Sequence, residues 1–536
     1  MLPIFKTKTF TNLGLQGYEI TVEADGNHAL PSIEIIGLPD AAVRESKERL
    51  RATFRHAGIP LPKHKIILNL SPSDTKKVGT SLDLSMAMAI LILIYQGKIY
   101  HRDHIDQYIF FWELGLDGNI KRVNGLLPSV INAIKHGYTH FFIPAENIHE
   151  LEYVHNITIY PLNNFEDIVA YFLENKEIPQ VAEAKNIHDL MIHHHYETSF
   201  EHIKGQLLAK RALSIAAAGL HNLLMVGGPG CGKTMLSKAL HSILPPLAFE
   251  EILEVSQIYS VVGKLTKDQP LIIQRPFRQI HHTASKISIV GGGSQLTPGE
   301  VSLAHKWILF FDELTEFPRE TLEVLRQPLE DKTIVISRVS GTIQYPANFM
   351  FVASMNPCKC GYYKDPEKPC TCSLFDIKKY QNKISWPLLD RIDMILEIPR
   401  ENVDKLLDTI PQENSETIRK KVLKARNIQQ KRFANFSKSA SNQSVTHSPL
   451  SVKRQMPPIF SNSQISSKDI DKLIPLETQA KNFLKDAARK LNLSPRVIHR
   501  TIKLARTIAD MEEDETVDIK HLAEALQYRN KTMFVE

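Results

Sequence analysis

The stretch Gly227-Gly228-Pro229-Gly230-Cys231-Gly232-Lys233-Thr234 fits the pattern G-x-x-x-x-G-K-[S/T] of a phosphate-binding loop. The apolar strand 222–226 precedes it, and the helical run 235–240 follows it. Glycines let backbone N–H groups close around phosphate oxygens, and the start of the helix adds partial positive charge. We expect Lys233 to reach the β- and γ-phosphates and Thr234 to hold Mg²⁺. All eight residues are candidate nucleotide-binding positions, and we expect no redox role for Cys231.

Polar residues also end two later strands of the same region. The apolar run 308–311 is followed at once by Asp312 and Glu313, about 80 residues after the loop. Ligands bind at the carboxyl ends of parallel strands, so we expect Asp312 to hold Mg²⁺ through water and Glu313 to polarise the attacking water. The strand 351–355 leads into Asn356, which we expect to hydrogen-bond the water or the γ-phosphate. A turn residue before Pro357 is the structural alternative for Asn356.

An arginine lies among acids and apolar residues in Leu388-Leu389-Asp390-Arg391-Ile392-Asp393. A guanidinium supplied by a neighbouring subunit stabilises the charge that spreads over a transferred phosphoryl group. A local ion pair of Arg391 with Asp390 or Asp393 explains the same pattern equally well. These residues alone leave both interpretations open.

Length and composition indicate several folded domains. The chain has 536 residues, 43% of them hydrophobic, which excludes a wholly disordered protein and suggests about three to four domains. A net charge of +6 is too small at this length to argue for a nucleic-acid partner. The N-terminus lacks a signal-peptide pattern, and the longest apolar run, 84–95, is shorter than the roughly 20 residues that span a bilayer. We therefore expect a soluble cytoplasmic protein without membrane contact.

The hydrophobic pattern divides the chain into four parts. Residues 1–172 alternate strand-like and helical runs, as an α/β domain does, and 173–199 form a linker that contains His193-His194-His195. We interpret the three histidines as a solvated loop, with metal binding as the less favoured alternative. Residues 200–400 show the alternation of a parallel nucleotide-binding sheet. Residues 401–536 are mostly helical, except for a polar stretch at 435–468 that we expect to be a flexible loop.

Together, the glycine loop, the acid pair, Asn356 and the Leu-Asp-Arg-Ile-Asp string resemble an AAA+ ATPase, and more specifically the ComM/YifB family of magnesium-chelatase-like AAA+ ATPases. The resemblance covers nearly the whole chain and is weakest over 435–468. Its further strings are Ile203-Lys204-Gly205-Gln206, Ala216-Ala217-Ala218-Gly219-Leu220-His221-Asn222, His281-His282-Thr283, Gly291-Gly292-Gly293-Ser294, Pro298-Gly299-Glu300, Leu325-Arg326-Gln327-Pro328-Leu329-Glu330, Asn356-Pro357-Cys358-Lys359-Cys360-Gly361 and Ala505-Arg506-Thr507-Ile508-Ala509-Asp510.

The resemblance implies an ATP- and Mg²⁺-dependent ring, expected to be a hexamer, with active sites between subunits. Arg391 matches the family's arginine finger, and Arg496 matches the sensor arginine of a C-terminal helical lid, with Arg500 one helical turn on as the runner-up. The segment 291–300 corresponds to an insertion near the centre of the ring. The family's activity implies a helicase that promotes branch migration during recombination of incoming DNA in natural transformation.

By the same resemblance, the N-terminal domain has a Lon-protease-like fold. Ser81, in Gly79-Thr80-Ser81, lies where that fold carries its nucleophilic serine. Such a serine needs an adjacent base, and the family's lysine position holds Leu127 here, while Lys121 lies off the pattern. We therefore expect no protease activity, and we expect Ser81 to cap or pack against the following helix.

Four of the five cysteines fall within the loop 358–372 as Cys358-x-Cys360 and Cys370-x-Cys372. Four thiolates suit tetrahedral Zn²⁺, although paired cysteines more often have two residues between them. We predict a structural zinc site. The alternatives are free thiols and, less favoured, a redox switch.

A run of basic residues is the candidate DNA contact. The segment 419–438 contains eight lysines and arginines and no acid. It could follow a phosphate backbone, with binding that weakens as salt rises, but a solvated helix face explains such a run more often. Lys264, Lys267 and Arg278, near the expected pore, are additional candidates. The chain has no recognised DNA-reading motif, so we expect contact with single-stranded or branched DNA to be independent of sequence.

The leading hypothesis is therefore an ATP-driven DNA motor. A chelatase-type ATPase subunit and a protein-remodelling ATPase without DNA contact are the alternatives. The Lon-like domain and the four-cysteine loop are not expected in a chelatase subunit, which favours the DNA motor.

Overall fold

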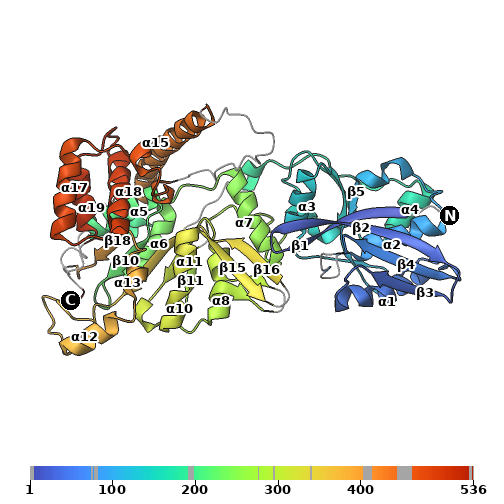
Figure 1. Ribbon diagram of the computed structural model, residues 1–536, viewed down its shortest axis with the longest axis horizontal. Helices are drawn as coiled ribbons and strands as arrows, with labels where there is room; N and C mark the ends of the chain where they lie inside the picture. Colours follow the sequence, from blue (N-terminus) through green and yellow to red (C-terminus); the bar gives the residue numbers. More distant parts are fainter. Residues whose placement is uncertain are drawn as a thin grey trace.

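A computed structural model of the protein describes residues 5–73, 77, 82–190, 198–275, 277–293, 296–338, 341–401, 413–442, 461–529 and 534. Figure 1 shows an elongated molecule with an N-terminal α/β lobe at one end and the C-terminal helices at the other. A second α/β region lies between them. Helix α7 (Phe249–Val261) and the hairpin of β15 (Thr333–Arg338) and β16 (Gly341–Pro346) lie on the side of this region that faces the N-terminal lobe.

The N-terminal lobe is built on a seven-stranded mixed sheet in the order β3-β4-β2-β1-β5-β8-β9. The strands are β1 (Phe5–Leu13), β2 (Gln16–Asn27), β3 (Ser32–Ile36), β4 (Lys65–Ser71), β5 (Tyr108–Phe110), β8 (His140–Pro144) and β9 (Thr158–Leu162), with a small hairpin of β6 (Glu113–Leu114) and β7 (Ile120–Lys121). The helices are α1 (Ala41–His56), α2 (Asp83–Ile94), α3 (Leu126–Lys135) and α4 (Phe165–Glu174).

Helix α2 lies in the core of this lobe. Its residues from Asp83 to Leu93 are all buried, because a helix whose only polar residues are Asp83 and Ser85 has no polar face to turn to solvent. The buried carboxylate of Asp83 pairs with Arg49 of α1 at 2.7 Å and accepts a hydrogen bond from Ser46. The longest apolar run of the sequence is thus a core helix. No helix within the described residues is both long and apolar enough to cross a bilayer.

The central region contains a five-stranded parallel sheet in the order β11-β14-β17-β10-β18. Its strands are β10 (Leu223–Val226), β11 (Phe277–Ile280), β14 (Ile308–Phe311), β17 (Met350–Met355) and β18 (Met394–Glu397), with a separate pair of β12 (Gly291–Gly292) and β13 (Thr297–Pro298). The other helices of this region are α5 (Leu207–Gly219), α6 (Lys233–Ile243), α8 (Lys286–Val290), α9 (Glu300–Leu303), α10 (Arg319–Glu323), α11 (Arg326–Asp331), α12 (Leu374–Gln381) and α13 (Trp386–Leu389).

The C-terminal part is helical, as the sequence predicts. It consists of α15 (Ser415–Asn442), α16 (Ile470–Leu473), α17 (Thr478–Lys490), α18 (Pro495–Met511) and α19 (Ile519–Gln527). Helix α15 packs against α5, α6 and α18. The sheets lie within the predicted domains 1–172 and 200–400, whose limits stay predictions.

The expected loop at 435–468 is shorter in the structure. Helix α15 continues to Asn442, and Asn462, Ile465 and Ile470 are buried against the lid helices. The polar composition misled the prediction, because Asn462 is a core residue that hydrogen-bonds Thr507 and Asp510. The middle of the stretch, 443–460, and His193-His194-His195 of the predicted linker lie outside the described residues.

The N-terminal lobe and the central region meet through α3 and α7. The carbonyl of Ser260 on α7 accepts the Gly125 N–H at 2.9 Å, and its hydroxyl donates to the carboxylate of Glu150 at 2.6 Å. Glu150 is 0% exposed, and burial raises its pKa even though hydrogen bonds from Ser260 and Asn147 lower it. A buried carboxylate therefore depends on a donor from the other lobe.

This contact surrounds the position where the Lon resemblance places a catalytic lysine. Leu127 is fully buried there, and its N–H lies 3.4 Å from the Ser260 hydroxyl oxygen. Lys121, the off-pattern lysine, is exposed on β7. The predicted cap Ser81, with Gly79 and Thr80, lies outside the described residues.

We expect Ser260→Ala to lower the free energy of unfolding by about 1–3 kcal/mol, because Glu150 loses a buried donor. Urea unfolding followed by tryptophan fluorescence measures the change. Ser288→Ala, at an exposed position of α8, is the control and should leave the midpoint nearly unchanged. Equal effects of the two variants would contradict a role for this hydrogen bond in joining the lobes.

Candidate nucleotide-binding site

Three neighbouring strands end at the candidate site. Parallel pairing aligns Val226 of β10 with Met355 of β17, and Phe311 of β14 with Ala353 of β17. The glycine loop follows β10, Asn356 follows β17, and the acid pair follows β14. Motifs that are up to about 130 residues apart in the chain thus meet at one edge of the sheet, where ligands bind in such folds.

The glycine loop requires its glycines for conformational and steric reasons. Gly230 and Gly232 have φ angles of +78° and +80°, which glycine adopts without strain. At Gly227, a Cβ atom would lie 2.5 Å from the carbonyl oxygen of Ile398. Helix α6 begins immediately afterwards at Lys233, so the positive end of its dipole lies at the loop.

Lys233 connects the loop to the neighbouring strand. Its ammonium group donates to the carbonyl oxygens of Gly227 and Gly228, at 2.8 Å each, and to Asn356 Oδ1 at 3.1 Å. Burial lowers its pKa, and the nearby Cys231, Asp312 and Glu313 act in the opposite direction. The structure therefore brings together Lys233 and Asn356, which the sequence predicts as partners at the γ-phosphate.

Thr234 and Asp312 form the second part of the site. The Thr234 hydroxyl donates to Asp312 Oδ2 at 3.0 Å. Neighbouring oxygens of an octahedral Mg²⁺ site lie about 2.9 Å apart, given metal–oxygen distances of about 2.0–2.1 Å. The two side chains therefore fit adjacent positions around Mg²⁺, either directly or through water.

Ser354 orients the acid pair, and the sequence analysis missed it. Its hydroxyl donates to Asp312 Oδ1 at 2.5 Å and accepts the Glu313 N–H at 3.3 Å. Ser354 is 0% exposed on β17, where a hydroxyl needs a partner. A polar residue inside the otherwise apolar run 350–355 was the available signal.

Glu313 has an unusual backbone for its residue type. Its φ angle is +52°, and its side chain is exposed beside the site. Left-handed backbone at a non-glycine residue is uncommon and is concentrated at functional sites. This geometry is compatible with a carboxylate that faces a water molecule.

The predicted arginines lie together at a separate place. Both Arg391 and Arg496 form ion pairs with Glu330 of α11, the latter at 2.5 Å. Arg391 is nearly buried, whereas the side chain of Arg496 is 55% exposed. The sequence assigned no role to Glu330, although it ends one of the quoted family strings.

The sequence left open a local ion pair between Arg391 and Asp393. In the structure, a different arginine pairs with the Asp393 carboxylate. Asp393 pairs with Arg500 at 2.5 Å and accepts the Asn222 N–H at 2.8 Å. Although burial favours its protonated form, Arg500 and His221 hold the pKa of Asp393 well below its usual range. Arg500, the runner-up for the sensor position, is thus held by a buried carboxylate.

The four cysteines of the loop 358–372 come together. The sulfur atoms of Cys358, Cys360 and Cys370 lie 3.3–3.7 Å apart, and the Cys372 sulfur is within 4.8 Å of each of them. Cys358 is buried, and the other three are partly exposed. Their grouping matches the ligand set of a tetrahedral metal site.

The basic segment 419–438 is less open than the sequence suggests. Arg426 is buried, and Arg432 pairs with the buried Asp510. Its exposed lysines include three that form ion pairs with acids outside the segment: Lys420 with Glu416, Lys421 with Glu413 and Lys424 with Glu513. The side chain of Lys438 lies outside the description. Glu413 and Glu416 lie just before the segment, whereas Asp510 and Glu513 are distant in the chain, and local sequence could not reveal them.

The three cations near the expected pore differ in whether they are exposed or paired with an acid. Lys264 and Lys267 are exposed, whereas Arg278 is paired with Glu300 at 2.5 Å. The pair β12–β13 packs against β15: a Cβ atom at Gly291 would lie 2.9 Å from Ile336, and one at Gly292 would lie 3.4 Å from Arg338. The predicted insertion and the hairpin β15–β16 therefore form one unit.

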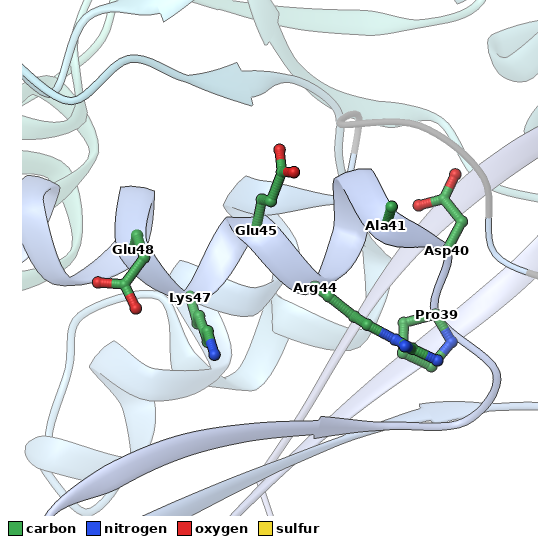
Figure 2. A pocket seen from close by; sticks show the side chains of 7 residues that line it. All are labelled: Pro39, Asp40, Ala41, Arg44, Glu45, Lys47 and Glu48. Carbon is green, nitrogen blue, oxygen red and sulfur yellow. The ribbon is translucent and has the colours of Figure 1, made fainter.

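A hollow of about 540 Å³ lies at the start of α1 in the N-terminal lobe. Figure 2 shows its charged side chains, among them Arg44, Glu45 and Glu48, pointing in different directions. No predicted site residue lines it. Divergent charges do not form the convergent polar set of a binding site.

Three models of known protein families together match most of the chain. The models that match are described as "Subunit ChlI of Mg-chelatase" over residues 22–147, "Magnesium chelatase, subunit ChlI" over 199–406 and "Magnesium chelatase, subunit ChlI C-terminal" over 412–529.

Similar proteins support the same relationship. The chain is 36% identical over 519 residues to Competence protein ComM of Haemophilus influenzae, covering 97% of this chain and 96% of that protein. It is 35% identical over 518 residues to protein YifB of Escherichia coli, covering 96% and 95%. A shorter match, 27% identical over 118 residues, covers 21% of this chain and 14% of Lon protease of Buchnera aphidicola.

We expect Ser354→Ala to lower kcat of Mg²⁺-dependent ATP hydrolysis by about 10-fold, because Asp312 loses the hydrogen bond that orients it. The Mg²⁺ concentration for half-maximal rate should rise as well. Steady-state phosphate release during an Mg²⁺ titration measures both values. Ser337→Ala, at an exposed position of β15, is the matched control, and an equal rate for the two variants would rule out this role of Ser354.

Proposed function

The chain belongs to the ComM/YifB family of magnesium-chelatase-like AAA+ proteins, and from this premise we propose that it is an ATP-hydrolysing motor that acts on DNA. The single observation that carries the ATPase part is the junction of Lys233, Thr234 and Asp312 at one edge of a parallel sheet. The DNA part rests on the family resemblance. The relative from Haemophilus influenzae carries the name competence protein.

Each residue of the site would have its own role in ATP hydrolysis. Bound Mg·ATP supplies the phosphoryl group that is transferred to water. Residues 227–234 would bind the phosphates, and Thr234 and Asp312 would hold the metal ion. Glu313 would orient and polarise the water, while Asn356, already within hydrogen-bond reach of Lys233, would fix the water or the γ-phosphate.

Arg391 and Arg496 would complete the site in a ring, which we propose to be a hexamer. Arg391 would act on the nucleotide of a neighbouring subunit, and Arg496 would contact nucleotide from the lid. Their common partner Glu330 lines a hollow of about 550 Å³ between α11 and α8. Both arginines would then exchange Glu330 for phosphate during assembly.

DNA contact would involve helix α8, directly before the insertion 291–300, and the hairpin β15–β16 more than the basic segment 419–438. Lys286 and Ile287 are exposed on α8, and Arg338 is exposed at the end of β15. An exposed apolar residue beside cations suits a strand of nucleic acid, which offers phosphates and base faces together. Lys264 and Lys267 are further exposed cations between α7 and β11.

A second candidate function is a chelatase-type ATPase subunit, which the matched family models favour by name. A protein-remodelling ATPase is the third. The DNA experiment below separates them from the motor, because neither alternative predicts that DNA raises the rate of hydrolysis.

We expect Lys233→Ala to abolish ATP hydrolysis, and Glu313→Gln to lower kcat at least about 100-fold while nucleotide still binds. Single-stranded, duplex or branched DNA should raise the rate of the unaltered protein, with binding that weakens as salt rises. Lys286→Ala should lower the DNA-stimulated rate more than the basal rate. Phosphate release and fluorescence anisotropy of labelled DNA measure these quantities.

Glu320→Gln, at an exposed position of α10, is the control for Glu313→Gln and should hydrolyse ATP normally. If Glu313→Gln also hydrolyses ATP normally, the assignment of the site is wrong. If no form of DNA binds at moderate salt or raises the rate, the motor hypothesis fails and the chelatase or remodelling function takes its place.

We expect Arg391→Ala to bind nucleotide but to lose hydrolysis by about 10³-fold, as removal of an arginine finger does. Mixing it with Lys233→Ala subunits should restore part of the rate, because each variant supplies what the other lacks at a shared site. Arg55→Ala, at an exposed position of α1, serves as the control. A persistent monomer in the presence of ATP would contradict the shared site.

A further inference from the structure

The loop 358–372 has the geometry of a tetrahedral thiolate site. Zinc–sulfur bonds of about 2.3 Å place the sulfur atoms about 3.8 Å apart, and three of the four sulfurs here lie 3.3–3.7 Å apart. A disulfide needs about 2.05 Å, so these distances do not describe one. The Gly361 N–H donates to the Cys358 carbonyl at 3.0 Å, which closes the turn that brings Cys360 back.

The basic residues near the cluster suit the negatively charged complex that four thiolates form with a zinc ion. Four thiolates around one Zn²⁺ carry a net charge of −2. The loop contains Lys359, Lys364 and Lys368, and Arg400 lies over the ring of Tyr362 at 5.4 Å. These cations compensate the negative charge that the metal leaves.

This loop packs directly against the phosphate-binding loop. A Cβ atom at Gly361 would lie 2.6 Å from the ring of Pro229, and one at Gly228 would lie 3.1 Å from the Gly361 carbonyl oxygen. Two backbones in such close contact cannot move independently. The cysteine loop also begins two residues after Asn356, which accepts a hydrogen bond from Lys233.

Arg400 connects the two loops a second time. Its guanidinium donates to the Pro229 carbonyl at 3.4 Å and lies 3.8 Å from the carboxylate of Asp365. That carboxylate accepts the N–H groups of Glu367 and Lys368, at 2.9 Å each, which shape the return of the chain towards Cys370. The cysteine loop is therefore fixed to the phosphate-binding loop at its start and near its middle.

We propose that the four cysteines bind one zinc ion and that the zinc-bound loop holds the phosphate-binding loop in its nucleotide-binding conformation. Without the metal, only hydrogen bonds such as that of the Thr371 backbone to Cys360 would join Cys358–Cys360 to Cys370–Cys372. Gly361 and Asp365 then no longer support Pro229. The metal site stands by itself, whereas the effect on nucleotide binding rests on the proposed function.

The first experiment measures zinc in the purified full-length protein by mass spectrometry of metals. We expect about one zinc per chain in the unaltered protein and in Thr371→Ser, a conservative change within the loop, and a loss of zinc in Cys370→Ser. Protein without zinc, after growth in zinc-supplemented medium, would overturn the metal site.

The second experiment measures the Kd of ADP with Mg²⁺ by calorimetry. Cys370→Ser should bind ADP about 10-fold more weakly, and Arg400→Ala should bind it more weakly too while keeping its zinc. Arg400→Ala keeps the proposal testable if Cys370→Ser does not fold. Unchanged affinity in a zinc-free variant, or in Arg400→Ala, would overturn the coupling. If the unaltered protein with zinc does not bind ADP, the proposed ATPase function fails, and the metal site is unaffected.

Discussion

The hydrogen bonds of Lys233 and Thr234 are the contacts on which the candidate site depends. Lys233 links the loop after β10 to Asn356 after β17, and Thr234 links the same helix start to Asp312 after β14. Two consecutive residues at the beginning of α6 therefore contact the residues that follow two other strands of the sheet. Because β17 lies between β10 and β14, its own polar residues, Ser354 and Asn356, fill the space between lysine and acid.

The parts of the site that are continuous in sequence were predictable, and the parts formed by distant residues were not. The glycine loop and the acid pair have fixed local patterns, and parallel strands bring them to one edge. No local sequence pattern points to Glu330, because the two arginines that pair with it lie about 60 and 166 residues away in the chain. Two ion pairs of the basic segment were hidden for the same reason: Asp510 belongs to α18, and Glu513 lies just after that helix.

The fold followed the hydrophobic pattern closely where that pattern was strong. The predicted strands at 222–226, 308–311 and 351–355 correspond to β10, β14 and β17, within one residue at each end. Asn442 and Asn462 show the limit of composition, since one extends a helix and the other is buried in a hydrogen-bonded core. The contact of Leu127 with Ser260 could not be read from sequence, although the absence of a lysine at that position could.

The pairing of Arg391 and Arg496 with one carboxylate has a consequence for the energy of assembly. In the proposed ring, an arginine that leaves Glu330 for a phosphate would exchange one anion for another, and the second arginine would stay paired with Glu330. The electrostatic gain is then only the difference between two ion pairs, which is small compared with either pair alone. Without nucleotide, Glu330 offsets only one of the two arginine charges, and in the proposed ring the phosphates would offset the other.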